Sequence, residues 1–305
     1  MDTGNNKIKK ATGIEKGNTR FALLIIIPAF IIAGVILYYP IFNSVSMAFQ
    51  KVYFGRGKFD WIGLANFKAI FERNDFIKTF GWTLIFGVIS TLLLLLVGMY
   101  FAMLLNRKMP GRNIIRGLLL IPWAIPVFVN SFLWLWLLDT QFGFINYILM
   151  TLHIIKEPLN WIGQTNYARI AIIMAYVWRV FPFNMIVYLA AFQTIDPVLY
   201  EAAEIDGAGK FNQFLYITIP QVKNIVIFTA LLNFIWSFQE FTTIWIMTKG
   251  GPVGATDTLI TRIYNLAFQN REFGIAAANG ALWIIFLIIF SIIYLRLLFF
   301  REEKE

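Results

Sequence analysis

The sequence predicts an all-α integral membrane protein with six transmembrane helices. Of its 305 residues, 59% are hydrophobic and only 14% are charged, and the mean hydropathy is +0.67. A soluble domain is usually about a quarter charged, so a chain this apolar cannot cover itself with polar surface in water. Two further observations support this class: apolar stretches long enough to cross a bilayer, and basic residues concentrated beside particular stretches.

Six stretches have the length and apolar character of a membrane span. They are residues 21–39, 79–105, 117–138, 170–193, 224–248 and 274–295. Only the fourth and fifth contain a charged residue, Arg179 and Glu240 respectively. The first stretch is too long for the apolar core of a signal peptide and is interpreted as an uncleaved anchor. Pro122 and Pro126 are expected to kink the third span, and Pro182 the fourth.

The distribution of lysine and arginine predicts the orientation of the spans. The segment before the first span is rich in basic residues: Lys7, Lys9, Lys10, Lys16 and Arg20. Because basic loops stay in the cytoplasm, we expect both the amino and the carboxyl terminus to be cytoplasmic. Residues 1–17, polar and rich in lysine, are expected to form a disordered cytoplasmic tail, and residues 18–305 the membrane domain.

Composition excludes several classes of function. The chain has no cysteine and a single histidine, His153, so thiolate and multi-histidine metal sites are excluded. A phosphate loop needs two glycines, a lysine and a serine or threonine at fixed spacing. Around Gly209 and Lys210, the first glycine is replaced by Glu204 and the hydroxyl residue by Phe211. We therefore expect no catalytic residue, no metal site and no ATP hydrolysis by this chain. The net charge of +9 is attributed to basic cytoplasmic loops, not to nucleic-acid binding.

The most informative segment is the cytoplasmic loop 194–222 between the fourth and fifth spans. Asp196 is a good N-cap, Pro197 suits a first helical turn, and Gly207 fits a left-handed helix end. A second helical piece follows Gly207, and Pro220 is expected to break it before the fifth span. The segment therefore predicts two short helices on the cytoplasmic face.

The charge of this helix pair distinguishes two roles for it. A helix that lies on lipid usually carries lysine and arginine on its polar face. The first helix instead carries Glu201, Glu204 and Asp206. Because acidic groups are unfavourable beside an anionic leaflet, docking to a protein partner explains the pattern better than binding to lipid.

The same segment resembles the "EAA" signature of binding-protein-dependent ABC importer permeases. Glu201-Ala202-Ala203, Gly207, Ile217 and Pro220 match this family in type and spacing, with Ile219 where leucine is usual. Asp206 before Gly207 and Ala208 after it are similar to the maltose and multiple-sugar branch. The resemblance extends along most of the chain through three further stretches: Ile62-Gly63-Leu64, Pro122-Trp123-Ala124-Ile125-Pro126 and Gly250-Gly251-Pro252.

The resemblance implies a type I ABC importer permease fold and a multi-pass subunit of the bacterial cytoplasmic membrane. It implies that a sugar or oligosaccharide is delivered by an extracytoplasmic binding protein, and that the partners are a second permease subunit and two ATPase subunits. ATP and Mg²⁺ would be bound by the ATPase, with no cofactor in this chain. The residues that would couple the permease to the ATPase are Glu201, Ala202, Ala203, Asp206 and Gly207.

Polar side chains within the spans are candidates for the substrate path. From the predicted spans, Arg179 and Glu240 lie roughly 12–14 Å below the outer surface, so we expect them to share a depth and to be able to pair. The pair either fixes helix packing or lines the path. A stripe at helical spacing could stack on and hydrogen-bond to a sugar: Asn233, Trp236, Gln239 and Glu240. Trp178 and Asn184 are weaker candidates.

Three alternatives remain open on the sequence. An importer of the same type could carry glycerophosphodiesters or polyols. A secondary transporter would tend to show internal repeats, which are not found here. A membrane-bound enzyme would need clustered histidine, aspartate or glutamate near one face, and the sequence has none.

Overall fold

The computed structural model describes residue 21 and residues 24–53, 58–73, 75–107 and 109–302. The predicted tail 1–17 lies outside the described residues. Within them, five helices are long and apolar enough to cross a membrane, and a bent pair of helices supplies a sixth crossing if it is counted as one span. The five are Leu24–Met47, Phe76–Asn106, Thr165–Phe192, Lys210–Phe238 and Phe273–Arg296.

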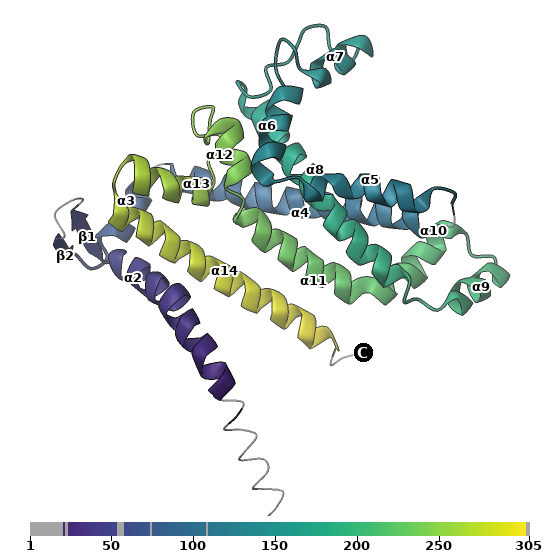
Figure 1. Cartoon of the computed structure of the whole chain (residues 1–305), viewed down its shortest axis with the longest axis horizontal. Helices are drawn as coiled ribbons and strands as arrows, with labels where there is room; N and C mark the ends of the chain where they lie inside the picture. Colours follow the sequence, from purple (N-terminus) through teal and green to yellow (C-terminus); the bar gives the residue numbers. More distant parts are fainter. Residues whose placement is uncertain (1–20, 22–23, 54–57, 74, 108, 303–305) are drawn as a thin grey trace, which may run out of the picture.

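The first span and the segment that follows it form one end of the molecule (Figure 1). The span includes a π-helical stretch, η1 (Gly34–Tyr38), and α2 (Tyr39–Met47). The predicted outer loop then contains an antiparallel hairpin of β1 (Gln50–Tyr53) and β2 (Lys58–Trp61), followed by the short helix α3 (Ala65–Glu72). The sequence did not predict this hairpin. Asn66 fixes it, because its Nδ2 donates to the carbonyls of Ala48 at 2.8 Å and Gln50 at 2.9 Å.

The predicted third span is broken in the middle. The helices α5 (Arg112–Ala124) and α6 (Val127–Leu137) are bent by 98° at this break. Ile125 is extended, with φ −72° and ψ 130°, because a residue before proline avoids helical geometry. The expected kink is therefore confirmed at Pro126, whereas Pro122 lies inside α5. The helix α7 (Phe144–Thr151) follows in the segment between the third and fourth spans.

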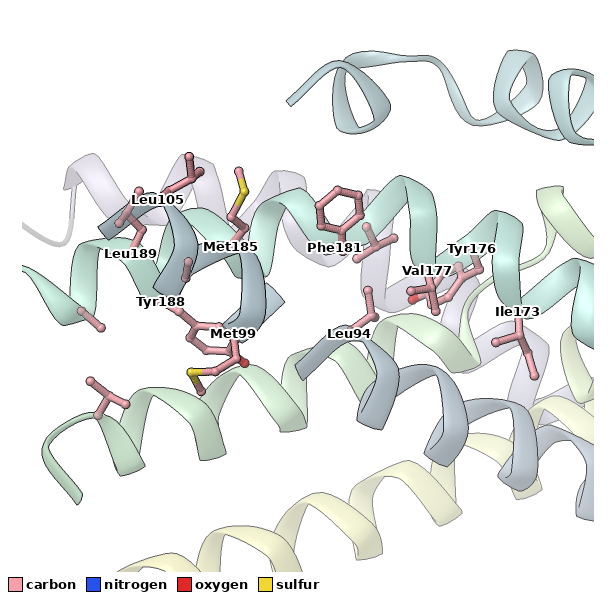
Figure 2. Close-up of a cluster of buried hydrophobic side chains, with 14 of the residues drawn as sticks. Leu94, Met99, Leu105, Ile173, Tyr176, Val177, Phe181, Met185, Tyr188 and Leu189 are labelled. Carbon is pink, nitrogen blue, oxygen red and sulfur yellow. The ribbon is translucent and has the colours of Figure 1, made fainter. Parts of the chain in front are cut away.

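The fourth span, α8 (Thr165–Phe192), continues unbroken through Pro182. It packs against α4 (Phe76–Asn106), the second span. Figure 2 shows the apolar side chains of α4 and α8 that fill the space between these helices. Gly98 of α4 permits the close approach, because a Cβ at this position would lie 2.5 Å from the Cβ of Asn184. Small residues at such contacts are typical of membrane helices.

The helix expected to end before Pro220 does not end there. From α10 (Lys210–Gln213) the chain passes through a π-helical turn, η2 (Phe214–Thr218), into α11 (Ile219–Phe238), and these form one continuous helix. The prediction that Pro220 breaks the helix is therefore wrong. The wider π-helical turn just before the proline, in which the amide of Ile219 bonds the carbonyl of Phe214, accommodates a residue that has no N–H.

The predicted fifth span, 224–248, is also not one helix. The chain leaves helical geometry after Phe238, and α12 (Thr242–Thr248) begins as a separate helix. After a turn at Gly250-Gly251-Pro252 come α13 (Leu259–Tyr264) and a π-helical stretch, η3 (Asn265–Gln269). The last span is α14 (Phe273–Glu302), which packs against α2, α3, α11 and α13.

Large apolar side chains face outward along the spans. In the first span, Leu24–Met47, all described side chains are exposed or half-buried, and Phe42 is 76% exposed. The surrounding solvent of such a surface is lipid or another apolar chain. The fold is therefore that of a multi-pass membrane protein.

Candidate functional site

The helix α9 (Pro197–Ile205) is closed at both ends by local hydrogen bonds, as the sequence predicted. Oδ1 of Asp196 accepts from the amide of Val198 at 3.0 Å, and Pro197 occupies the first helical position. At the other end Gly207 has φ +79°, and the amides of Gly207 and Ala208 donate to the carbonyls of Glu204 and Ala203. This paired arrangement is the Schellman helix end. The backbone groups at both ends of the helix are thus satisfied locally.

Every residue of α9 is exposed or half-buried. Glu201, Ala202, Asp206 and Gly207 are exposed and Ala203 is half-buried, while Ile205 is 87% exposed. Figure 1 places α9 at the end of the molecule opposite the β1–β2 hairpin, on the side where α4 and α5 are connected. The helix therefore presents small, acidic and apolar side chains together on a surface that the rest of the chain does not cover.

One side chain ties α9 to the membrane helices. The hydroxyl of Tyr200 lies 2.9 Å from that of Thr218, at the end of η2. A second tie lies just beyond the helix, where Nε2 of Gln213 donates to the carbonyl of Ala208 at 3.1 Å. These contacts join α9 and the turn after it to the helix that becomes α11.

The break between α11 and α12 is built around Glu240, which is 7% exposed. Its Oε2 accepts from Nη2 of Arg179 at 2.7 Å, and its Oε1 accepts from the amide of Thr243 at 2.8 Å. The carboxylate thus neutralises a charge on α8 and caps the first turn of α12. The expected pairing of Arg179 with Glu240 is confirmed.

The structure divides the predicted polar stripe on the fifth span. Asn233 is fully buried and its amide pairs with that of Asn184, whereas Gln239 is exposed and Trp236 is 39% exposed. Trp236 and Gln239 are therefore exposed, whereas Glu240 is buried in its pair with Arg179. Asn233 and Trp236 both lie within α11, but helical spacing alone could not show that Asn184 pairs with Asn233 and buries it.

Trp236 belongs to a row of three aromatic rings that the sequence analysis did not predict. The rings of Trp123, Phe183 and Trp236 come from α5, α8 and α11, with centroids 6.0 Å and 5.1 Å apart. Trp123 is 52% exposed. A signal for Phe183 was present in the sequence, because it lies four residues after Arg179 and so shares its helix face. Trp123 could not be placed without knowing the bend between α5 and α6.

Several polar atoms near the ion pair are buried without a hydrogen-bond partner. In the described part of the chain these include the Tyr176 hydroxyl, Nε of Arg179 and Oγ1 of Thr243. The Arg179 guanidinium lies 5.8 Å from the ring centre of Tyr176. Buried polar groups are nearly always paired, so this concentration marks a place with spare capacity for hydroxyl or water ligands.

A second group of charged side chains, which the sequence analysis did not identify, joins the starts of α4, α13 and α14. Arg262 donates to both carboxylate oxygens of Asp75, at 2.5 Å and 3.0 Å, and Arg73 does the same to Glu272 at 2.8 Å and 2.9 Å. The hydrogen bond from Arg262 holds the pKa of Asp75 below its usual range, and that from Arg73 does the same for the pKa of Glu272. Burial raises the pKa of nearby Asp257 to about 6.

In the part of the chain that the structure describes, no group of three or more histidine, aspartate or glutamate side chains is placed to hold a metal ion. The two features with functional geometry are therefore α9, at one end of the molecule, and the Arg179–Glu240 pair with its aromatic neighbours.

Comparison with known proteins gives a consistent result. Residues 94–301 match the family described as "Binding-protein-dependent transport system inner membrane component". The trehalose/maltose transport system permease protein MalF of Thermococcus litoralis is 31% identical over 284 residues, which cover 93% of this chain and 95% of that protein. The sn-glycerol-3-phosphate transport system permease protein UgpA of Yersinia pestis is 29% identical, covering 92% of this chain and 94% of that protein.

A solved structure shares the fold. It belongs to a bacterial ABC transporter involved in the import of the acidic polysaccharide alginate. Its matching chain superposes with a TM-score of 0.80 at 23% sequence identity, covering 95% of this chain and 98% of that chain.

Proposed function

The chain belongs to the family of binding-protein-dependent transport system inner membrane components, and from this premise we propose that it forms half of the translocation path of an ATP-driven importer for a sugar or oligosaccharide. It is a permease subunit and not an enzyme. A separate pair of ATPase subunits binds ATP and Mg²⁺, a second permease subunit completes the path, and an extracytoplasmic binding protein delivers the substrate.

The observation that carries this proposal is the construction of α9. A short helix, capped by Asp196 and ended by Gly207, stands exposed at the end of the membrane bundle with its own chain covering none of its residues fully. Such a surface fits into a groove of a partner. Ala202 and Ala203 allow close approach, Gly207 sets the exit angle, and Glu201 and Asp206 offer carboxylates to basic groups of the ATPase.

The orientation follows from the same end of the molecule. The connection between α4 and α5, which contains Arg107 and Arg112, lies at the end that carries α9 (Figure 1). We assign this end, together with both termini, to the cytoplasm. Because the chain has no cysteine, single cysteines at Asn212 and at Lys249 can be tested with an impermeant maleimide. Labelling of the Asn212→Cys variant in intact cells would contradict the assignment.

The substrate path passes Arg179, Trp236, Gln239 and Glu240, with Trp123 and Phe183 beside them. Exposed rings offer stacking surfaces for sugar faces, and the exposed amide of Gln239 offers hydrogen bonds to hydroxyl groups. Buried polar atoms without partners beside the ion pair increase this capacity. Asn233 is assigned to helix packing, since its amide is already paired with Asn184.

A glycerophosphoryl substrate is the second candidate, because a relative is named as an sn-glycerol-3-phosphate permease. An anionic substrate needs a free cation in the path. Arg179 is already paired with Glu240 at 2.7 Å, so the site is close to neutral. This favours an uncharged polyhydroxyl substrate over a phosphate.

The test is purification of the complex in detergent with the wild-type chain, Gly207→Asp and Glu201→Ala, followed by measurement of ATP hydrolysis. We expect the ATPase to copurify with the wild type, and both variants to lose either the ATPase or the hydrolysis stimulated by the binding protein. Glu157→Ala is the control, because it removes an exposed carboxylate from the segment between α7 and α8, away from α9. Absence of any ATPase from the wild-type preparation would overturn the proposal.

A further inference from the structure

The facing sides of α8 and α11 are joined by polar side chains that pair in antiparallel order along both helices. We call this series the polar ladder; its contacts are Arg179 with Glu240, Asn184 with Asn233, Tyr188 with Thr229, and Tyr200 with Thr218. From each contact to the next, the residue number of the first partner rises while that of the second partner falls by a similar amount. The two middle contacts therefore fix one register of α8 and α11. The first contact uses Glu240, in the break after α11, and the last uses Tyr200, beyond the end of α8 on α9.

The central contact is a reciprocal pair of amides. Nδ2 of Asn233 donates to Oδ1 of Asn184 at 2.7 Å, and Nδ2 of Asn184 donates to Oδ1 of Asn233 at 3.3 Å. Both side chains are fully buried. A slide of one helix by a single residue would break both bonds and leave amides unpaired inside the bundle, where no water replaces them.

The third contact joins two hydroxyl groups, those of Tyr188 and Thr229, which lie 2.6 Å apart and either of which can donate. Oγ1 of Thr229 also lies 2.9 Å from the carbonyls of Ile225 and Val226 in its own helix. The hydroxyl of Tyr188 also lies 3.5 Å from Oδ1 of Asn184. Tyr188 is fully buried among the side chains of Figure 2. This bond, like the amide pair, exists in one register only.

The two ends of the ladder meet the two functional features of the molecule. At the inner end Tyr200 connects α9 to Thr218, at the end of η2 and within the continuous helix that becomes α11. At the outer end Glu240 holds Arg179 with one oxygen and the first turn of α12 with the other. The ladder thus has one end at the exposed helix and the other at the helix break beside the aromatic row.

We propose that the polar ladder locks α8, α9 and α11 into one rigid unit, so that a displacement of α9 reaches Glu240 and α12 without sliding between α8 and α11. The inference rests on the proposed function of α9 as the helix that docks to the ATPase. Apolar contacts between membrane helices are nearly as good after a small slide, whereas paired amides and hydroxyls are not. Asn184, Tyr188, Thr229 and Asn233 are therefore positioning residues of the transport cycle.

The test uses the assembled complex in nanodiscs, with spin labels on Asn166→Cys and Gln221→Cys of the cysteine-free chain. Both positions are exposed and lie at opposite ends of α8 and α11, so the distance between them changes when one helix slides along the other. Distances are measured without nucleotide and with ATP and vanadate, in parallel with ATP hydrolysis stimulated by the binding protein. The variants are Thr229→Val, Tyr188→Phe and the double variant Asn184→Leu/Asn233→Leu.

We expect one narrow distance that is the same in both nucleotide states of the wild type. In the ladder variants the distance should shift or broaden with ATP, and stimulation by the binding protein should fall several-fold while the ATPase still copurifies. Thr229→Ser, which keeps the hydroxyl, and Asn279→Leu, whose amide bonds only its own helix, should behave as the wild type. These controls separate register from general stability, because lost stability alone would not depend on nucleotide.

Two results would overturn the proposal that the ladder locks the helices together. One is a distance between the labels of the wild type that changes with nucleotide. The other is a set of ladder variants that keep both the narrow distance and full stimulation of ATP hydrolysis by the binding protein. Each leaves the proposed function intact, because the ATPase still copurifies. Failure of the proposed function is recognised separately, as a wild-type chain with which no ATPase copurifies.

Discussion

Nη2 of Arg179 donates to Oε2 of Glu240 at 2.7 Å, although the two residues are 61 positions apart in the chain. Arg179 lies within the continuous helix α8, and Glu240 lies in the break between α11 and α12. The contact therefore joins an unbroken span to a broken one. Both charges lie well inside the predicted membrane region, where an unpaired charge is costly.

Removing one charge of the Arg179–Glu240 pair should destabilise the protein more than removing both charges. Arg179→Gln or Glu240→Gln leaves a buried unpaired charge, and we expect each to cost about 3–5 kcal/mol. The double variant Arg179→Gln/Glu240→Gln should recover part of that loss, while transport stays impaired if the pair also lines the path. Thermal unfolding of the four purified proteins forms the double-mutant cycle. Strictly additive losses would show that the two charges do not interact.

The exit turn of α9 should tolerate only glycine or asparagine at position 207. Gly207 has φ +79° and open space around it, so Gly207→Ala is strained by its backbone alone, by about 1–2 kcal/mol. Gly209 also has open space but φ −66°, so Gly209→Ala is the matched control and should be nearly neutral. Hydrogen exchange of the α9 amides in the purified permease measures the difference. Equal exchange in the two variants would contradict the assignment of strain to Gly207.

The same substitution is expected to have opposite effects on stability at two glycines of α4, because only one of them lies against α8. A Cβ at Gly98 would lie 2.5 Å from the Cβ of Asn184, and we expect Gly98→Ala to destabilise by about 1–3 kcal/mol through overpacking. Gly81, in the same helix, has no neighbour within 4 Å, so Gly81→Ala should stabilise by up to about 1 kcal/mol through helix propensity. Melting temperatures in detergent test both signs. A gain in melting temperature for Gly98→Ala would show that the helices are not in contact there.

Stability of the protein should depend on pH through Asp257, in the segment between α12 and α13. Burial raises its pKa to about 6 from 3.8, so the folded protein binds more protons than the unfolded chain between these values. The contribution of this group to stability is therefore lowest above pH 6 and improves as the pH falls from 6 toward 4. Asp257→Asn, which keeps an acceptor for Thr261, should raise stability at pH 7.5 by up to about 3 kcal/mol.

The same substitution should have a much smaller effect at pH 4.5, where Asp257 of the wild type is largely protonated in the folded protein. Melting curves of both proteins at the two pH values measure the difference. Arg262 and Asp75 face the same group, so Asp75→Asn serves as a control with the opposite sign: it removes a carboxylate whose pKa is lowered by Arg262 and should destabilise at pH 7.5. A stabilisation by Asp257→Asn that is equal at both pH values would contradict the assigned titration.

The caps of α9 could be read from the sequence because each depends on residues close together in the chain. Asp196, Pro197 and Gly207 act on backbone groups within a few positions of themselves, and the structure places all three as expected. The prediction that Pro220 breaks the helix was wrong, although the feature that overrides it is also local. The π-helical turn at Phe214–Thr218 accommodates the proline, and no sequence pattern identified it in advance.

The sequence by itself determined the membrane class, the kink at Pro126 and the short helix between Asp196 and Gly207. The class follows because apolar length decides which segments can cross a bilayer, and the kink and the helix depend on residues close together in the chain. Only the tertiary structure decided that the fifth span breaks at Glu240 and which polar residues meet. The break at Glu240 is stable because Arg179, from another helix, neutralises the carboxylate that caps α12. The amide of Asn233 is satisfied by Asn184, not by a ligand. Such choices depend on partners distant in the chain, because a polar group buried in a membrane protein must be paired by whatever the fold brings to it.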